Sequence, residues 1–498
     1  MSQIFRTKDL DAILSASAAP GRQLKRTLGA FDVTMLGIGA IVGAGIFATV
    51  GTAAAGDAAR PGAGPALILS FVVTAIACGF AALCYAEFAA MVPISGSAYT
   101  YAYATLGELV AWIIGWDLII EYAVGNVAVA ISWGNYFKTL MAGFGIDIPA
   151  WLSTDYRTAA RIPGLFESAP HLFGIPIVFN ILAFAIVALI TIVLVIGIRE
   201  SASLNTGMVI LKLLVLGLFV GVGWQYTKAE NWQPFAPNGW AGVQSGAAIV
   251  FFAYIGFDAV STVAEETKDP KRDLPIGIIG SLVVCTVIYI VVAAVFTGII
   301  PYGVLVNKLA TEQAEPLTMA LQYADIGRWG SFLVGVVAFG SVVAHTAVLL
   351  VFQLGQPRIF FSMARDGLLP SSFARVHPRY RTPHVTTILT GVAVGVCAMF
   401  TSIDEMVDLT NIGTLFAFVL VCIGILVLRK RDPDRPRPFR TPLVPFVPLA
   451  GVCSCAYLML GLPWITWVRF GLWLLAGLGV YFLYGHKRSN LSDKRLPT

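Results

Sequence analysis

The chain has 498 residues, of which 57% are hydrophobic and only 12% are charged, and its mean hydropathy is +0.79. Soluble proteins carry roughly 25% charged residues, so this composition excludes a soluble protein and predicts an all-α integral membrane protein. The net charge of +5 does not indicate a nucleic-acid partner, because the basic residues fall in the predicted loops between spans.

Twelve stretches are apolar over about 20 residues, the length that a helix needs to cross the hydrocarbon core. Residues 1–28, which precede the first of them, are polar and basic and contain no apolar signal core. We therefore expect the first span to direct insertion into the membrane. The predicted spans are 31–54, 65–91, 98–130, 175–198, 203–224, 241–263, 276–300, 329–356, 384–402, 405–428, 443–463 and 466–485.

The distribution of Lys and Arg predicts the orientation of these spans. If both termini lie in the cytoplasm, 24 of the 33 basic residues fall on the cytoplasmic side and eight on the outer side. Cytoplasmic loops of membrane proteins carry such an excess of Lys and Arg. We therefore expect a multi-pass protein of the plasma (inner) membrane, surrounded by membrane lipid, with both termini cytoplasmic.

Glycine interrupts the first and the sixth predicted spans, in GIGAIVGAGIF at 37–47 and in FFAYIGFD at 251–258. Unwound backbone persists in a membrane only against protein or a water-filled cavity, and paired interruptions are typical of transporter substrate sites. Their positions predict a 5+5 inverted repeat with broken helices 1 and 6. The predicted parts are a cytoplasmic segment 1–28, a first repeat 29–224, a second repeat 225–428, spans eleven and twelve within 429–485 and a cytoplasmic tail 486–498.

The two breaks would present complementary backbone groups. A half-helix that begins near Ile46 would offer free N–H groups and about half a positive charge, which suits a carboxylate. Carbonyls freed near Phe252, Ala253 and Ile255 would accept hydrogen bonds from an ammonium group. An α-amino acid carries both groups on one carbon. The alternative is that the glycines only allow close packing of helices.

Several motifs together resemble those of the amino acid–polyamine–organocation superfamily. The pattern at 37–47 resembles the first span of that superfamily, and FAYIGFDAVS at 252–261 resembles the sixth span of its cationic amino acid transporter branch. PISGSAY at 93–99, QPR at 356–358 and MARDG at 363–367 also match. The resemblance extends from about residue 25 to residue 485. It implies a bacterial member with the LeuT-type fold, proton-linked amino acid transport and no bound sodium.

Lys212 lies in the middle of the fifth predicted span. A charge there is expensive unless it is paired or deprotonated, and intramembrane ionisable residues are functional by default. In the resembled branch a lysine at this place substitutes for a sodium ion and reaches toward the first break, which implies proton coupling. Glu121 is the predicted acidic partner, and it shares a helix face with Asp117. One alternative is that the ammonium stays bonded to backbone carbonyls. Another is that the carboxylates cap polar groups or face the outer vestibule, which is the interpretation favoured for Asp117.

Two further side chains are candidates for the pocket. The resemblance implies that Phe257 closes over bound substrate and that His345 borders the pocket for the substrate side chain. The alternatives are a core aromatic residue and a core histidine with satisfied nitrogens. The predicted substrate-binding residues are Ile41, Gly43, Ala44, Gly45, Ile46, Phe252, Ala253, Ile255, Phe257 and His345, and the predicted proton-coupling residues are Lys212 and Glu121.

The leading hypothesis is a secondary active transporter that symports amino acids with protons by alternating access between the first and sixth spans. An obligate amino acid/amine exchanger and a non-transporting amino acid sensor are the alternatives. A channel is disfavoured because the spans hold only isolated ionisable groups, and an enzyme because no catalytic cluster is apparent. The resemblance implies small neutral or cationic amino acids as substrates, H⁺ as the coupling ion and no sodium, and we expect no cofactor or metal. The sequence does not indicate protein partners.

Overall fold

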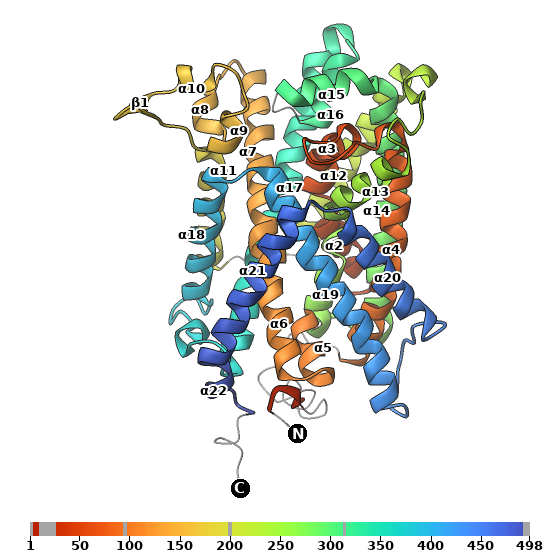
Figure 1. The fold of residues 1–498 in the computed structure, drawn as a ribbon, viewed down its shortest axis with the longest axis vertical. Coiled ribbons are helices and arrows are strands. Elements are labelled where there is room, and N and C mark those ends of the chain that lie inside the picture. The colour runs from red at the N-terminus through yellow and green to blue at the C-terminus, as the bar shows by residue number, and fades with distance from the viewer. Residues whose placement is uncertain (1–2, 9–25, 93–96, 198–201, 312–314, 492–498) are drawn as a thin grey trace.

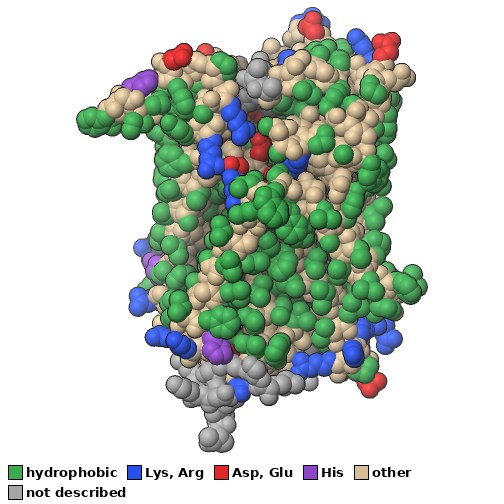
Figure 2. All heavy atoms as spheres, in the orientation of Figure 1, with side chains coloured by type: hydrophobic (Ala, Val, Ile, Leu, Met, Phe, Trp, Pro, Cys, Tyr) green, Lys and Arg blue, Asp and Glu red, His purple; other side chains and the backbone are tan. Residues whose placement is uncertain are grey.

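The computed structural model describes residues 3–8, 26–92, 97–197, 202–311 and 315–491. In this part of the chain the protein is a bundle of helices with one short β-hairpin that projects from one end (Figure 1). Hydrophobic side chains cover the middle of the face shown in Figure 2, and Lys and Arg side chains gather along its lower part. Residues 93–96 of the predicted motif, most of segment 1–28 and the end of tail 486–498 lie outside the described residues.

Nine helical segments of the described chain are long and apolar enough to cross a membrane, so this is a multi-pass membrane protein. They are formed by α2 (Ala30–Ile41) with η2 (Gly45–Thr49) and α3 (Val50–Ala55), α4 (Leu67–Met91), α6 (Glu108–Ile119) with η4 (Ile120–Val124) and α7 (Gly125–Gly143), α12 (Ala202–Gly223), α13 (Gly239–Val250) with η7 (Phe251–Tyr254) and η8 (Asp258–Glu266), α14 (Pro270–Ile299), α17 (Gly330–Arg365), α19 (Ile403–Arg431), and α21 (Trp464–Val480) with η11 (Tyr481–Gly485) and α22 (His486–Arg488). Three apolar helices are shorter, namely α11 (Ile181–Ile196), α18 (His384–Phe400) and α20 (Phe446–Leu460).

Both predicted helix breaks are present in the structure. α2 ends at Ile41, Val42 is extended, and the chain resumes as a π-helical turn at Gly45. In the other segment, α13 passes into the 3₁₀ turn η7, and Gly256 has φ +118° before η8 begins at Asp258. Because side-chain-bearing residues rarely adopt this φ, the second break requires glycine at that position.

The predicted single span 98–130 is wrong. α5 (Ser97–Thr105) is a separate helix, Gly107 turns the chain with φ +107°, and a helix then runs from Glu108 to Gly143. The hydropathy of the sequence does not reveal this turn, because the residues on both sides of it are apolar. A Cβ added at Gly107 would lie 2.9 Å from Phe5 Cα, so the N-terminal segment packs into the turn.

Segments predicted as loops also contain helices. The predicted outer loop that follows α7 holds α8 (Ala150–Ser153), α9 (Tyr156–Ala159), α10 (Leu165–Ser168) and β1 (His171–Leu172). β1 pairs with β2 (Ile175–Pro176) in a hairpin, and β2 occupies the start of the predicted span 175–198. α15 (Tyr302–Thr311) and α16 (Pro316–Tyr323) precede α17. α17 has 36 residues, about 54 Å at 1.5 Å per residue, so it continues beyond a hydrocarbon core of about 30 Å and past the predicted span 329–356.

The two ends of the described chain meet at one end of the bundle. Arg6 Nη1 donates a hydrogen bond to the carbonyl of Leu491 at 2.7 Å, and Ser489 Oγ bonds to the buried carboxylate of Glu108. These contacts require both ends to lie on the same side of the membrane. An even number of spans predicts that arrangement.

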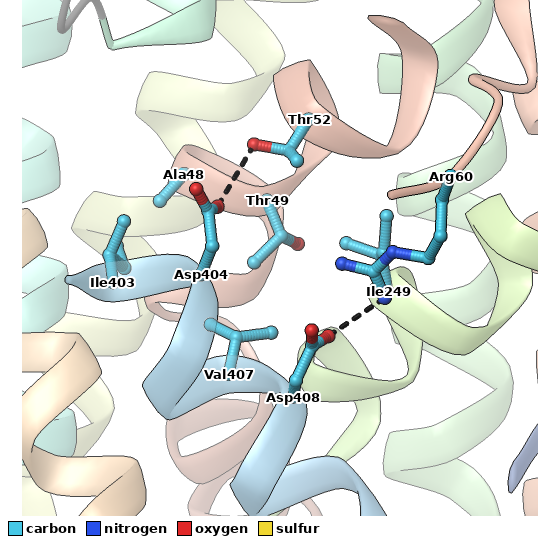
Figure 3. Close-up of a pocket in the computed structure, with 9 residues that line it drawn as sticks. All are labelled: Ala48, Thr49, Thr52, Arg60, Ile249, Ile403, Asp404, Val407 and Asp408. Carbon is cyan, nitrogen blue, oxygen red and sulfur yellow. Dashed lines mark hydrogen bonds and ion pairs between the residues drawn. The ribbon is translucent and has the colours of Figure 1, made fainter. Parts of the chain in front are cut away.

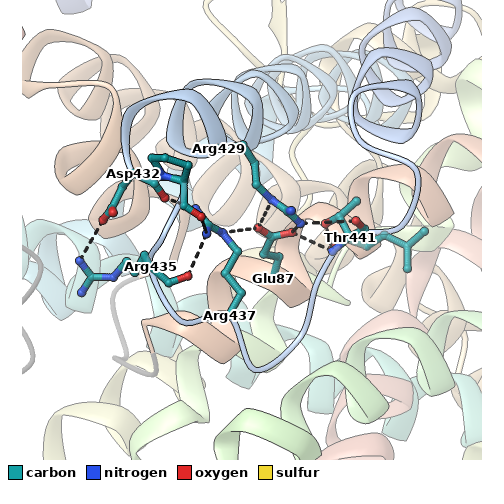
Figure 4. A network of polar contacts seen from close by, with 8 residues as sticks. Glu87, Arg429, Asp432, Arg435, Arg437 and Thr441 are labelled. Carbon is teal, nitrogen blue, oxygen red and sulfur yellow. Dashed lines mark hydrogen bonds and ion pairs between the residues drawn. The ribbon is translucent and has the colours of Figure 1, made fainter.

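A buried carboxylate holds the connector that follows α19. Glu87 of α4 accepts hydrogen bonds from Arg429 Nε and Nη2, both at 2.8 Å, and from the backbone N–H of Thr441 at 2.7 Å (Figure 4). The guanidinium of Arg437, whose side chain is 1% exposed, lies 3.2 Å from the same carboxylate. Two arginines therefore neutralise Glu87 and fix the connector against α4.

We expect Glu87→Gln to lower the free energy of unfolding by about 3 kcal/mol, because it leaves the buried Arg437 without a counter-charge. The measurement is thermal unfolding of the purified protein in detergent. Asp432→Asn is the control, because its carboxylate is 42% exposed and 3.5 Å from Arg435, and an exposed pair contributes about 0–1 kcal/mol. Equal unfolding temperatures for the two variants would contradict the role given to Glu87.

Candidate functional site

The two helix breaks touch each other. A Cβ added at Gly45 would lie 2.1 Å from Ala253 Cα, so only glycine fits at this contact. A Cβ added at Gly256 would lie 2.9 Å from the carbonyl carbon of Ala40, so the second break also approaches the end of α2. Unwinding and close packing, which the sequence presents as alternatives, therefore occur together.

Lys212 on α12 bonds directly to the first break. Its Nζ donates to the carbonyls of Gly39 and Val42, both at 2.8 Å, and the residue is 0% exposed. The structure thus contains the ammonium bonded to backbone carbonyls. The predicted pairing with Glu121 is wrong, because the titratable groups near this ammonium are Cys285 and His345. Glu121 lies on η4, which packs against α19, α7 and α17.

Two tyrosines bond to other carbonyls of the first break. Tyr289 of α14 donates to the carbonyl of Ile41 at 3.0 Å, and Tyr136 of α7 donates to the carbonyl of Phe47 at 2.6 Å. A helix end leaves its last carbonyls without helical partners. The tyrosines and Lys212 replace those partners and so stabilise the unwound backbone.

The other backbone groups predicted to bind substrate belong to residues 43–46 of the first break and to Phe252, Ala253 and Ile255 of the second. Residues 43–46 form the turn and the start of the second half-helix, where N–H groups have no helical partner. Within the described chain, no backbone hydrogen bond outside the helical turns ends on the carbonyl of Phe252, Ala253 or Ile255. The start of the second half-helix lies against the turn that contains Ala253.

Three buried carboxyl groups gather beside the second break. Glu121 lies next to Asp258 and Asp117, and each of the three is at most 2% exposed. Within the described residues, Glu121 Oε2 and all four aspartate oxygens lack a hydrogen-bond partner. Asp117 therefore caps no polar group among the described residues. Buried polar groups are nearly always hydrogen-bonded, so these groups call for a functional explanation. Four neighbouring hydroxyl groups are also buried without a hydrogen-bond partner in the described chain. They belong to Tyr85, Tyr101, Ser261 and Thr414.

His345 has the contacts of a satisfied core histidine. Its Nδ1 lies 2.6 Å from the carbonyl of Ser341, and its Nε2 lies 2.8 Å from Ser132 Oγ. Because a carbonyl can only accept, Nδ1 carries the hydrogen and Nε2 is free to accept from the serine. The ring also packs against Phe47 and Tyr136, with centroids 5.9 and 5.6 Å away. His345 therefore supports the first break from the side of α17.

Phe257 lies in an aromatic cluster. Its ring centroid is 5.0 Å from that of Phe418 on α19 and 6.0 Å from that of Tyr85 on α4, and the residue is 0% exposed. These are the contacts of a core aromatic residue. They tie the chain just after the second break to α4 and α19.

Sequence reasoning missed a polar face of α19. Asn411 Nδ2 donates to the carbonyls of Ala248 at 2.8 Å and Ile249 at 3.2 Å, one turn before the second break. Asp404, Asp408 and Asn411 are spaced by four and three residues, which places them on one helix face. That spacing within an apolar span is visible in the sequence and could have identified α19 as a wall of the site.

A small, partly open pocket lies beside the two breaks, with Thr49 and Ile249 one helical turn from them (Figure 3). Arg60 spans it, with Nη1 2.8 Å from Asp408 and Nη2 2.7 Å from Asp57. Burial lowers the pKa of Arg60, but the carboxylates of Asp408 and Asp57 raise it above its usual value. The guanidinium therefore stays charged and connects the loop after α3 to α19.

Comparison with known proteins identifies the relatives of this chain. The profile of a family described as amino acid permease matches residues 28–476. The branched-chain amino acid permease BcaP of Bacillus subtilis is 48% identical over 98% of this chain and 99% of its own length. The methylthioribose transporter of Bacillus subtilis is 44% identical over 99% of this chain and 100% of its own length. The vacuolar cationic amino acid transporter 4 of Arabidopsis thaliana is 34% identical over 87% of this chain and 68% of its own length.

Proposed function

The chain belongs to the amino acid permease family of the amino acid–polyamine–organocation superfamily, whose members are transporters and not enzymes, and on this premise we propose that it is a secondary active transporter of amino acids that works by alternating access. The observation that carries the proposal is the contact between two unwound helix breaks, Gly45 against Ala253. Transporters with paired broken helices bind their substrates at such half-helix ends.

We also propose that the protein has twelve membrane spans in a LeuT-type arrangement. The shorter helices α11, α18 and α20 have 16, 17 and 15 residues, about 22 to 26 Å at 1.5 Å per residue, and a bilayer thins locally around short spans. With them the protein has twelve spans. A LeuT-type arrangement of inverted repeats, 29–224 and 225–428, with 429–485 added, is supported by one break in each half. The excess of basic residues supports cytoplasmic termini, on segments 1–28 and 486–498, in the plasma membrane.

In the proposed complex, the N–H groups of residues 43–46 bind the substrate carboxylate, and the carbonyls of Phe252, Ala253 and Ile255 bind its ammonium group. Opposite ends of helix dipoles favour these two charges. The contact at Gly45 brings the two sets of groups together. Alternating access then means that the breaks separate and rejoin as the path opens to one side or the other.

The walls of the first break favour a neutral substrate side chain. Phe47 and Tyr136 are apolar or hydroxyl-bearing, and His345 is bonded through both ring nitrogens. The carboxyl groups of Glu121 and Asp258 lie beside each other. The Glu315 carboxyl, which lies near Tyr136, accepts a hydrogen bond from Thr139 Oγ1 at 2.7 Å. We propose leucine, isoleucine and valine as the first substrates to test, because the relative with 48% identity is named a branched-chain amino acid permease.

Methylthioribose is a second candidate substrate. The relative with 44% identity, aligned over 99% of this chain, is named for it. Methylthioribose is uncharged and carries a methylthio group that suits an apolar wall, but it has no carboxylate for the first break. Binding of methylthioribose in preference to leucine would contradict the pairing of backbone groups with a zwitterion.

We propose that the coupling ion is H⁺ and that no sodium ion is needed. The Lys212 ammonium already bonds to the carbonyls of the first break, where a metal cation would otherwise find its ligands. Glu121 and Asp258 lie side by side in a low-dielectric environment, and two such carboxylates repel each other when both are ionised. The pair is therefore suited to take up a proton and release it during the cycle.

Uptake into proteoliposomes tests the proposal. With an inside-alkaline pH gradient, we expect labelled leucine to accumulate above its external concentration and to leave again when a protonophore collapses the gradient. Uptake only into vesicles preloaded with amino acid or amine would show an exchanger and would contradict symport. Thermal stabilisation by leucine without any flux would show a sensor and would contradict transport.

Glu121→Gln should lower gradient-driven accumulation at least about tenfold, the size of a typical coupling free energy, because the amide cannot take up a proton. Exchange of labelled for unlabelled leucine should persist, since it needs no net proton movement. Glu167→Gln is the control, because that carboxylate is exposed on α10. Accumulation in the Glu121 variant equal to that in the control would remove Glu121 from the coupling mechanism.

A further inference from the structure

The β-hairpin β1–β2 exposes an apolar tip. Leu172 pairs with Ile175 across a two-residue turn in which Phe173 and Gly174 have φ +51° and +79°, as in a type I′ turn. Leu172, Phe173 and Ile175 are 57%, 96% and 63% exposed. Three neighbouring exposed apolar side chains at a tip indicate a surface that contacts a membrane or another protein.

The chain around this tip contains no acidic side chain, lysine or arginine. Residues 168–198, which read SAPHLFGIPIVFNILAFAIVALITIVLVIGI, contain no Asp, Glu, Lys or Arg. The hydropathy of this run predicts a span from 175, yet α11 begins only at Ile181. The residues that hydropathy assigns to the membrane before Ile181 therefore form β2 and the irregular connection that follows it. No Asp, Glu, Lys or Arg therefore opposes the entry of the tip into a membrane interface.

The tip lies close to the lipid-facing side of the bundle. Only residues 177–180 separate β2 from α11, a reach of at most about 14 Å. α11 packs on α18, and Asn180 N–H donates to the carbonyl of Met399 at the end of α18. Both helices expose apolar side chains outward, and the hairpin projects sideways from the bundle on this side (Figures 1 and 2). The exposed residues are Leu189, Ile192 and Ile196 on α11 and Ile388, Leu389, Val392, Val396 and Phe400 on α18.

We propose that the hairpin tip inserts into the interfacial layer of the adjacent lipid leaflet and anchors the subdomain of α8, α9 and α10 to the membrane. The interfacial layer is about 5 to 7 Å thick on each side of the hydrocarbon core and favours aromatic side chains. A second copy of the chain is a poorer occupant, since a stable protein interface buries about 800 Å² per partner and the tip offers three side chains. The hairpin projects on the same side of the bundle as the lipid-facing surface of α11 and α18 (Figure 1).

Spin labelling in proteoliposomes tests this anchor. A nitroxide at Phe173→Cys is compared with one at Glu167→Cys, an exposed position of α10 in the same subdomain, in a background where the exposed Cys397 and Cys453 are replaced by serine. At 173 we expect collisions with O₂, which concentrates in lipid, to exceed those with a water-soluble nickel chelate several-fold. At 167 we expect the reverse order.

Equal preference for the nickel chelate at both positions would place the tip in water and overturn the proposal. Dipolar broadening at 173 that disappears on dilution with unlabelled protein would identify a second copy as the occupant and would also overturn it. A label at Ile175→Cys, 63% exposed in the native chain, repeats the measurement if the variant at 173 is not recovered folded. Leucine binding, followed by thermal shift, reports the fold of each variant independently of the tip.

Discussion

Lys212→Ala abolishes concentrative uptake if Lys212 controls the first break. The variant removes the donor for two buried carbonyls, those of Gly39 and Val42. An unsatisfied buried carbonyl costs about 1–3 kcal/mol, so together the two carbonyls cost about 2–6 kcal/mol. Each 1.4 kcal/mol is a factor of about ten, and the arrangement in which the breaks meet should therefore lose at least about 30-fold in population. Labelled leucine uptake under a pH gradient measures the effect.

Two variants separate the ammonium from the volume of the side chain. Lys212→Met keeps the length and the apolar stem but donates no hydrogen bond, so it should lose uptake as Lys212→Ala does. Leu214→Ala lies on the same helix with its side chain 65% exposed and should leave uptake close to the native rate. Concentrative uptake that survives in both lysine variants would exclude Lys212 from the mechanism.

The features predicted correctly from the sequence are those with a local cause. The break near Gly45 follows from a dense run of small residues, and the break at Gly256 from a single position that adopts φ +118°. The contact of Lys212 with the first break, by contrast, is implied by the family resemblance and not by a local pattern. Lys212 accordingly bonds to Gly39 and Val42.

The errors concern contacts between distant segments. Glu121 is assigned to Lys212 by charge alone, whereas its position on η4 turns it toward Asp258. A count of apolar residues does not show that Gly107 separates α5 from α6, because the turn depends on packing against Phe5. The partner of Arg60 on α19 is 348 residues away, and no periodicity in either segment specifies that pair. Which side chains meet in such cases is decided by the packing of whole helices, not by local pattern.

Gly45→Ala tests the contact on which the proposed function rests. The added methyl group would lie 2.1 Å from Ala253 Cα and 2.7 Å from Ala253 N. Backbone atoms cannot turn aside as a flexible side chain can, so the breaks must separate. Overpacking of this kind costs about 1–3 kcal/mol, equivalent to about five- to 150-fold in an equilibrium. We expect leucine affinity and uptake to fall by a factor in this range.

Gly217→Ala is the matched control, because a Cβ added there meets nothing within 4 Å, and alanine favours a helix over glycine. It should transport as the native protein does. Adding Ala253→Gly to Gly45→Ala should not restore uptake, because the Cα and N of residue 253 stay where the clash occurs. Rescue by the double variant would show that only two side chains compete for space. The contact would then be ordinary helix packing, and the meeting of the two unwound backbones would lose its place as the substrate site.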